Sequence, residues 1–343
     1  MQIPYRYINR LKFSVIKQIL TIFLLSCLPA FLPAQDSLKN PVPANDSTNV
    51  AVANQAQGTN TRSPDKKRIW LVAGGHAAVW AISYVALNKA WYADYPKEDF
   101  HFFNDWEEWN QMDKAGHVWT AYQLSRFSTE AWRWTGLKKS TSIWIGSASA
   151  VAYQSIIEIQ DGFSSQWGFS WGDMTANIVG AAAFAAQELT WGDQRIQVKM
   201  SYWPYEYPDD LIDRRNQLFG TGSLERILKD YNSQTYWASA NLKSFIPNSK
   251  LQKWLNISFG YASELMLGGR ENTWTDKDGV YHDRTDIERK RRFFLAPDID
   301  LTKIKTKSKF IRGLLFTLNA VKLPAPTLEL DSKGTFKVHA IYF

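Results

Sequence analysis

Two pairs of polar residues in the middle of the chain have the spacing of one helix face. Asp113 and His117 are four residues apart, and Glu158 and Asp161 are three apart. Residues at these spacings lie on the same side of an α-helix. Carboxylates and an imidazole brought together are groups that bind a divalent metal ion or transfer protons. The spacings therefore predict a shared polar centre between helices.

A third group of polar residues follows a segment rich in Trp and Gly. Asp173 and Asn177 repeat the four-residue spacing, and Ser170 precedes Asp173 by three residues, as in an S-x-x-[DE] capping box. Charged groups in such apolar, Ala-rich surroundings must be paired, hydrogen-bonded or liganded. The predicted polar or ligand-binding cluster comprises Asp113, Lys114, His117, Glu158, Asp161, Ser170, Asp173 and Asn177.

Candidate metal ligands within this cluster are one imidazole and three carboxylates. The set consists of His117, Glu158, Asp161 and Asp173. Zinc or another divalent ion accepts such ligands and can activate water, with a spare carboxylate as base. The spacing is not a recognised zinc signature such as HExxH. A divalent metal is therefore the one cofactor that the sequence brings into consideration.

The same residues also have a structural interpretation. Asp113 can cap a helix that begins at Lys114, Ser170 and Asp173 can form a capping box, and Glu158 can pair with Lys114 across the bundle. His117 can be a hydrogen-bonded core histidine. No nucleophile with an adjacent base is recognisable. A structural polar core, a ligand or metal site and a catalytic centre all remain open at this point.

These residues need helices to position them, and the chain predicts four. Apolar or mixed helical patterns cover residues 69–87, 114–134, 142–160 and 174–189. Gly180 and the alanines after it allow helices to approach closely. Facing side chains in a bundle of about four helices can hold a site in its interior. The segment 94–111, aromatic and acidic, is expected to be a surface loop that folds over the bundle or touches lipid headgroups.

After Arg195 the pattern changes to a period of two, which is typical of strands. Strands are predicted at 196–202, 236–245, 255–265, 291–303, 311–321 and 335–343, with a short helix at 224–231. The fold class is therefore α+β: a helical bundle followed by an antiparallel β-sheet or partial β-barrel. The last strand ends in aromatic residues and resembles the C-terminal strand of bacterial outer-membrane β proteins.

The first 34 residues resemble an export signal. Basic residues without an acidic one precede an apolar run that is interrupted by prolines, and cleavage is expected after Ala34. The alternative is lipoprotein processing at Cys27, which follows a loose lipobox. Residues 35–67 lack periodicity and are expected to be a disordered linker. The predicted division is a signal peptide (1–34), a linker (35–67), a helical domain (68–192) and a β region (193–343).

Composition narrows the location and partners of the protein. Aromatic residues make up 15% of the 343 residues, with 16 Trp, which favours a membrane–water interface. The mean hydropathy of −0.33 argues against a polytopic inner-membrane protein. The single Cys excludes a disulfide framework. Loss of four leader cations lowers the net charge from +7 to +3, too little to predict nucleic-acid binding.

The order of the motifs is similar to that of known families. D-K-x-x-H, then E-x-x-D, then W-G-x-S-x-x-D-x-x-x-N-x-x-G resembles the YfiM-like family, a domain of unknown function described as a predicted periplasmic lipoprotein. The pattern is also distantly similar to VanZ-like proteins. The resemblance covers about residues 110–190. It implies an exported envelope protein and does not imply a settled chemistry.

Two hypotheses of function follow. The first is a non-enzymatic cell-envelope protein, associated with the outer membrane or its periplasmic face, whose polar cluster is structural or binds a ligand. The second is a metal-dependent hydrolase that acts on lipid or cell-wall material. The expected partner is membrane lipid or the outer-membrane surface. The basic run 289–292 fits a lipid-headgroup contact, and no nucleic acid is expected.

Overall fold

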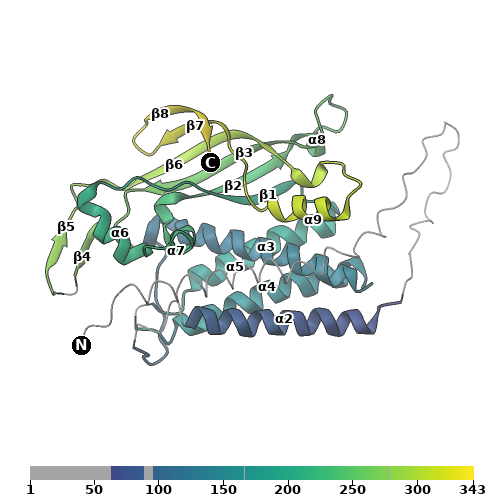
Figure 1. Ribbon diagram of the computed structural model, residues 1–343, viewed down its shortest axis with the longest axis horizontal. Coiled ribbons are helices and arrows are strands. Elements are labelled where there is room, and N and C mark those ends of the chain that lie inside the picture. The colour runs from purple at the N-terminus through teal and green to yellow at the C-terminus, as the bar shows by residue number, and fades with distance from the viewer. Residues whose placement is uncertain (1–62, 89–95, 166, 277) are drawn as a thin grey trace.

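A computed structural model describes residues 63–88, 96–165, 167–276 and 278–343. Figure 1 shows a layer of long helices on one side and a twisted antiparallel sheet on the other. The α+β fold class is therefore confirmed. The predicted signal peptide, both processing sites and residues 35–62 of the linker lie outside the described residues. Helix α2 begins at Lys66, within the last residues assigned to the linker.

Four long helices precede the sheet, as the periodicity predicted, and each begins and ends within three residues of the expected position. They are α2 (Lys66–Leu87), α3 (Met112–Trp134), α4 (Lys139–Asp161) and α5 (Trp171–Thr190). Figure 1 shows α3 nearest the sheet and α2 as the outermost helix of the layer. Whether residues 68–192 and 193–343 are separate domains stays a prediction.

Small residues bring α4 and α5 close to α3. A Cβ added to Gly180 of α5 would lie 2.2 Å from the carbonyl oxygen of Val118, and one added to Gly146 of α4 would lie 2.6 Å from the backbone nitrogen of Thr129. Neither distance can accommodate a side chain, because the two backbones are in direct contact. The predicted close approach at Gly180 is therefore present, and it brings the polar faces of the three helices together.

Helix α2 is exposed over most of its surface. Within Lys66–Ala86, an apolar stretch of 18 residues has a mean hydropathy of 1.5, and 11% of this stretch is buried. Among the described residues, this helix has the length and composition to cross a membrane. It contacts α3 through a hydrogen bond between His76 Nε2 and Ser128 Oγ, 2.8 Å apart, and through the Asp65 N–H, which donates to the Thr135 carbonyl.

The main sheet has six antiparallel strands in the order β1-β2-β3-β6-β7-β8. The strands are β1 (Ile196–Tyr202), β2 (Gln234–Asn241), β3 (Leu255–Glu264), β6 (Lys290–Ile299), β7 (Ala325–Asp331) and β8 (Phe336–Tyr342). Strands β1 and β8 are the two ends of the sheet, so the described strands form an open sheet rather than a closed barrel. Beyond β1, the Met200 N–H donates to the Ala320 carbonyl and the Lys322 N–H donates to the Met200 carbonyl.

One predicted strand is wrong. Residues 311–321 were expected to be a strand, but Lys309–Leu318 forms helix α9. Ser308 caps this helix by accepting a hydrogen bond from the Ile311 N–H. The β-branched and aromatic residues here favour a strand locally, whereas packing of Phe316 against Phe127 of α3 favours the helix.

Other elements of the sheet half were missed or predicted too long. Strand β7 and the hairpin β4 (Thr273–Thr275) and β5 (Tyr281–Asp283) had not been expected. The predicted strands 236–245 and 291–303 end early, because Asn241 and Asp300 cap the short helices that follow. The remaining short helices are α6 (Ile212–Phe219), α7 (Ser223–Lys229), which had been expected, α8 (Leu242–Phe245), η3 (Glu108–Gln111), η4 (Asp209–Leu211), η5 (Tyr231–Ser233) and η6 (Leu301–Lys303).

The described part of the aromatic segment lies against the loop between α4 and α5. Phe103 N–H donates to the Phe169 carbonyl, and Phe169 N–H donates to the His101 carbonyl. The rings of Phe100, Phe102 and Phe169 contact one another, and Phe169 is buried while Phe100 and Phe102 remain exposed. This segment therefore covers one end of the helices, as expected of a surface loop.

Candidate functional site

Helix α3 contributes three residues of the polar cluster from its first two turns. The helix begins at Met112, so Asp113 lies in the first turn and is not the cap that one interpretation assigned to it. Trp109, Asn110 and Gln111 precede the helix with φ between 49° and 62°. Consecutive non-glycine residues in the left-handed region are strained and persist only where surrounding contacts hold them.

Contacts from the sheet half hold this strained segment. The Trp109 N–H donates to the Gly269 carbonyl at 2.6 Å, and Asn110 Nδ2 donates to Ser263 Oγ at 2.8 Å. Arg291 Nη1 donates to Gln111 Oε1 at 2.5 Å. The position of Asp113 relative to the rest of the cluster is therefore set by the sheet as well as by the helices.

Lys114 is a buried cation surrounded by carboxylates. Its Nζ atom lies 2.7 Å from Asp105 Oδ2, 2.7 Å from Asp173 Oδ1 and 3.2 Å from Asp113 Oδ2. The suggested pairing of Lys114 with Glu158 is not among these contacts. Asp105 was missed in the sequence because it lies in the irregular segment before α3, where no periodicity marks it.

Ser170 connects this cation to the start of α5. Its hydroxyl donates to Asp105 Oδ1 at 2.5 Å and accepts from the Asp173 N–H at 3.0 Å. The predicted cap is therefore confirmed, since Ser170 is the N-cap of α5. A second unpredicted contact comes from η5, where the Tyr231 hydroxyl donates to Asp113 Oδ1 at 2.7 Å.

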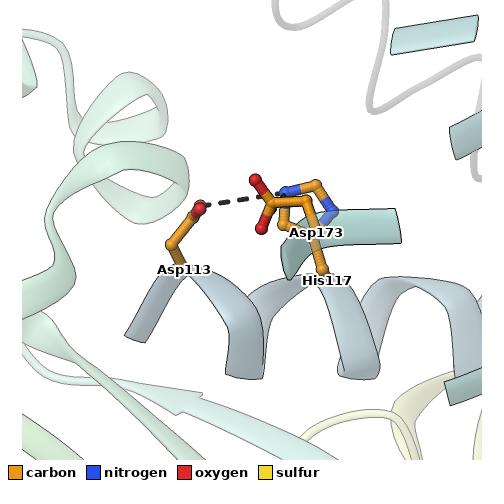
Figure 2. Close-up of side chains that lie close together, drawn as sticks. All are labelled: Asp113, His117 and Asp173. Atoms are coloured by element: carbon orange, nitrogen blue, oxygen red, sulfur yellow. Dashed lines mark ion pairs between the residues drawn. The ribbon is translucent and has the colours of Figure 1, made fainter. Parts of the chain in front are cut away.

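His117 stands between two carboxylates. Its Nε2 atom lies 3.8 Å from Asp113 Oδ1 and 3.6 Å from Asp173 Oδ1. Figure 2 shows the three side chains directed toward one another, two from α3 and one from α5. The separations are longer than a hydrogen bond. In the described part of the chain, the ligand atoms of Asp113, His117 and Asp173 lie within 4.8 Å of one another.

The other ring nitrogen of His117 is held by a hydrogen bond. Nδ1 lies 3.0 Å from Asn177 Oδ1, and Gln154 Nε2 donates to the same oxygen at 2.9 Å. An amide oxygen accepts and never donates, so Nδ1 carries the proton. The lone pair of Nε2 is then directed toward Asp113 and Asp173. Gln154 was missed in the sequence because it lies on an otherwise apolar stretch of α4.

Glu158 is the most deeply buried carboxylate of the cluster, with a side chain that is 1% exposed. Its Oε1 lies 3.7 Å from His117 Nδ1 and has no hydrogen-bond partner. Burial, and next the negative charges of Asp161 and Asp113, raise the pKa of Glu158 to about 9. Asp161 therefore acts on the cluster through its charge, and Asp113 takes the place among the convergent ligand atoms that the sequence had given to Asp161.

The pKa values of Asp113, Asp173 and Lys114 are shifted by burial and by the charges of their neighbours. Burial acts to raise the pKa of Asp113, but the charges of His117 and Lys114 outweigh it and lower the pKa to about 2. Burial, and then the charge of Asp113, raise the pKa of Asp173. Burial acts to lower the pKa of Lys114, whereas Asp113 and Asp173 raise it more. The carboxylates thus outnumber the ammonium group that they surround.

A family model described as a predicted periplasmic lipoprotein (DUF2279) matches residues 99–188. The match covers α3, α4, most of α5 and the aromatic segment, and it supports an exported, envelope-associated location. No curated protein and no solved structure matches the chain. The names YfiM-like and VanZ-like stay predictions, as do the roles of the individual site residues.

Proposed function

We propose that this chain is an exported envelope protein whose helices hold a divalent metal ion, with zinc as the best candidate, between Asp113, His117 and Asp173. The observation that carries the proposal is the position of His117 Nε2, 3.6 Å and 3.8 Å from two carboxylate oxygens. Two ligand atoms on a tetrahedral zinc ion, each about 2.0 Å from the metal, are about 3.3 Å apart. A small adjustment of the side chains therefore brings all three atoms into coordination distance.

The hydrogen bond on the far side of the ring supports this assignment. Metal-binding histidines commonly donate their second N–H to an oxygen, which fixes the tautomer and the ring orientation. Asn177 Oδ1 accepts that proton here, and Gln154 holds the amide in place. A core histidine with a purely structural role would be expected to use both nitrogens in hydrogen bonds.

The number of carboxyl groups in the cluster also supports a bound metal ion. Asp105, Asp113 and Asp173 contact the ammonium group of Lys114, and a fourth carboxyl group, that of Glu158, lies beside His117. Buried negative charge in excess is costly unless protons or a cation offset it. The neutral imidazole and carboxylates suit zinc, and carboxylates with one imidazole also suit manganese.

Metal analysis of the purified full-length chain tests the proposal. We expect about one equivalent of zinc after loading, and binding at least tenfold weaker for His117→Ala and for the milder His117→Gln. The matched control is His282→Ala, because His282 contacts a single carboxylate, Asp276, at 2.7 Å on an exposed hairpin. Folded wild-type protein that binds neither zinc nor manganese would leave the cluster as a structural polar core.

Hydrolysis of lipid or cell-wall material is the second candidate function. The observation that favours it is Glu158 Oε1, buried beside the imidazole without a hydrogen-bond partner. A carboxyl group in this position can transfer protons in a reaction on a metal-bound water. Glu158→Gln should then abolish turnover of phospholipid or peptidoglycan fragments while zinc binding remains. Equal turnover by wild type and variant would remove this candidate.

The outer membrane is the location that we propose for the protein. The alternating C-terminal strand and the many aromatic residues support it. Density-gradient fractionation of the expressing bacterium is the test. Recovery with outer-membrane markers is expected, and recovery with inner-membrane or soluble periplasmic markers would contradict this location.

A further inference from the structure

The inner side of the main sheet combines many buried polar side chains with one apolar cluster (Trp237, Ala262, Phe294 and Ala296), whereas its outer side is apolar. Buried polar residues on the inner side include Lys199 of β1, Ser239 of β2 and Asp298 of β6. The alternate positions are apolar and more exposed, as in β3, where Asn256 and Ser258 are buried while Phe259 is 54% exposed. A sheet that packs its core in water shows the opposite arrangement.

Strand pairing assembles the exposed apolar side chains into continuous rows. In the register of the sheet, Phe259 lies opposite Leu295, Leu295 opposite Leu328, and Leu328 opposite Val338. These four side chains are 41% to 69% exposed.

A second row runs beside the first. It joins Tyr261, Phe293, Leu330 and Phe336 across the same four strands. We call the exposed side chains of both rows the outer apolar face, defined by Phe259, Leu295, Leu328, Leu330, Phe336 and Val338.

The same side of the sheet is covered over its first two strands and at one end of β3, where Tyr261 packs with Met112 and the Asn110 side chain contacts Ser263. Met200 of β1 and Tyr236 of β2 pack with Met112 at the start of α3. Figure 1 shows β6, β7 and β8 extending away from the helices. The outer apolar face therefore continues a surface that is buried elsewhere in the molecule, and contiguous exposed apolar surface of this kind marks an interaction site.

Basic residues border one end of the outer apolar face. Arg291 lies on β6 at that end and donates to the Tyr261 hydroxyl at 2.6 Å. Lys333 lies in the turn between Leu330 and Phe336, where it is exposed and pairs with the exposed Glu288. The turn is joined to the same end, because the Ser332 N–H donates to the Arg291 carbonyl. Cations and aromatic hydroxyls beside an apolar band are typical of the boundary between acyl chains and headgroups.

Helix α9 repeats this combination on a smaller scale. Phe310, Ile311 and Leu314 are 45% to 71% exposed, and they follow the exposed Lys305 and Lys307. An exposed apolar helix face with lysines beside it binds the interface of anionic membranes.

We propose that the outer apolar face contacts the acyl chains of a lipid bilayer that contains anionic lipids, with Arg291 and Lys333 at the level of the headgroups. Apolar side chains outside and polar side chains inside are the pattern of strands that face lipid. The proposal rests on the membrane association proposed above and is independent of the metal site. It identifies the surface that makes the contact.

Vesicle binding by the full-length protein tests the proposal. In vesicles of phosphatidylcholine and phosphatidylglycerol, the double variant Phe259→Glu/Leu328→Glu should bind at least tenfold more weakly than wild type. The matched control is Val280→Glu/Tyr281→Glu, because these apolar residues are equally exposed but belong to the small hairpin. We expect the control to bind within twofold of wild type. Equal binding by all three proteins would overturn the proposal.

A spin label gives a second readout that needs no charged substitution. In a Cys27→Ser background, a nitroxide at Val338→Cys should collide more often with oxygen than with a water-soluble nickel complex once vesicles are added. A label that stays accessible to nickel contradicts lipid contact. Spin–spin broadening without lipid would identify a second copy of the chain as the occupant instead. The vesicle and spin-label results do not depend on whether density-gradient fractionation places the protein in the outer membrane.

Discussion

Lys199 and Asp298 of the sheet interior face each other at 2.8 Å, whereas His117 in the helices stands 3.6 Å and 3.8 Å from its carboxylates. Arg292 and Glu329 form a second directly paired set of charges in the sheet interior, 2.7 Å apart. The helical cluster leaves carboxylates in excess.

The sheet interior and the helical cluster therefore differ in how their buried charged groups are partnered. In the sheet interior Lys199 Nζ directly contacts Asp298 Oδ2, although Asp298 Oδ1, like Glu158 Oε1, has no hydrogen-bond partner. The helical cluster keeps Glu158 Oε1 and His117 Nε2 without short contacts, so it retains the capacity to bind a cation.

The largest effect is expected for Asp298→Asn in the sheet interior. The substitution leaves Lys199 buried without its counter-charge, which costs about 3–5 kcal/mol of the free energy of unfolding. Denaturant titration followed by tryptophan fluorescence measures it. The double variant Lys199→Met/Asp298→Leu should recover most of the loss, and a single-variant loss below about 1 kcal/mol would show that the pair is not matched as described.

The Arg292–Glu329 pair should make the sheet sensitive to acid. Burial acts to raise the pKa of Glu329, but hydrogen bonds and charge from Arg292 outweigh it, so the pKa lies below its ordinary value of 4.5. The folded state therefore holds the ionised form to lower pH than the unfolded state. This stabilisation is present above pH 4.5 and is lost as the pH falls through the folded pKa.

Comparison of Glu329→Gln with wild type at several pH values measures this contribution. At neutral pH the variant should be about 2 kcal/mol less stable, which is typical of a charge-assisted hydrogen bond. As the pH falls through the folded pKa of Glu329, the two proteins should converge. A difference that does not depend on pH would argue that Glu329 contributes through packing and not through its charge.

The same carboxylate-to-amide change should have the opposite sign in the helical cluster. Without metal, Glu158→Gln should raise the free energy of unfolding by about 1 kcal/mol, because it removes a buried acid that lacks a counter-charge. Thermal and denaturant unfolding of metal-free protein measure it. Destabilisation comparable to that of Asp298→Asn would erase the distinction between the two interiors.

The smallest effect is expected for an exposed pair. Lys333 and Glu288 are 44% and 66% exposed, so a double-mutant cycle to Ala should give a coupling energy below about 0.5 kcal/mol. This value sets the reference for a contact between opposite charges in water. A coupling above about 1 kcal/mol would show that exposure does not separate this pair from the buried ones.

Local patterns predicted the helices well and the sheet half less well. The four long helices follow from apolar periodicity that extends over many turns. Helix α9 was predicted as a strand because its ten residues favour either structure until Phe316 packs on Phe127. Strand β7 was missed because Pro324 and Pro326 at its start interrupt a strand pattern.

The candidate site also contains residues that the sequence predicted and residues that it did not. Helical spacing placed Asp113 with His117, and Asp173 with Asn177, and Ser170 was recognisable as a cap. Asp105 comes from the irregular segment just before α3, and Tyr231 comes from η5 in the sheet half, so no helical spacing marks either residue. Their contacts with Lys114 and Asp113 depend on how the loop and the sheet pack against α3.

By itself, the sequence determined that the chain contains polar helix faces and strands with two unlike sides, because side-chain periodicity follows from backbone geometry. The tertiary structure decided which of those sides lies inside. Alternation along a strand separates polar from apolar residues but carries no information about which set faces the interior. Only the packing of β1, β2 and β3 at the start of α3, and the charges that meet on the inner side, show that in this protein the side rich in polar residues is enclosed and most of the apolar side is exposed.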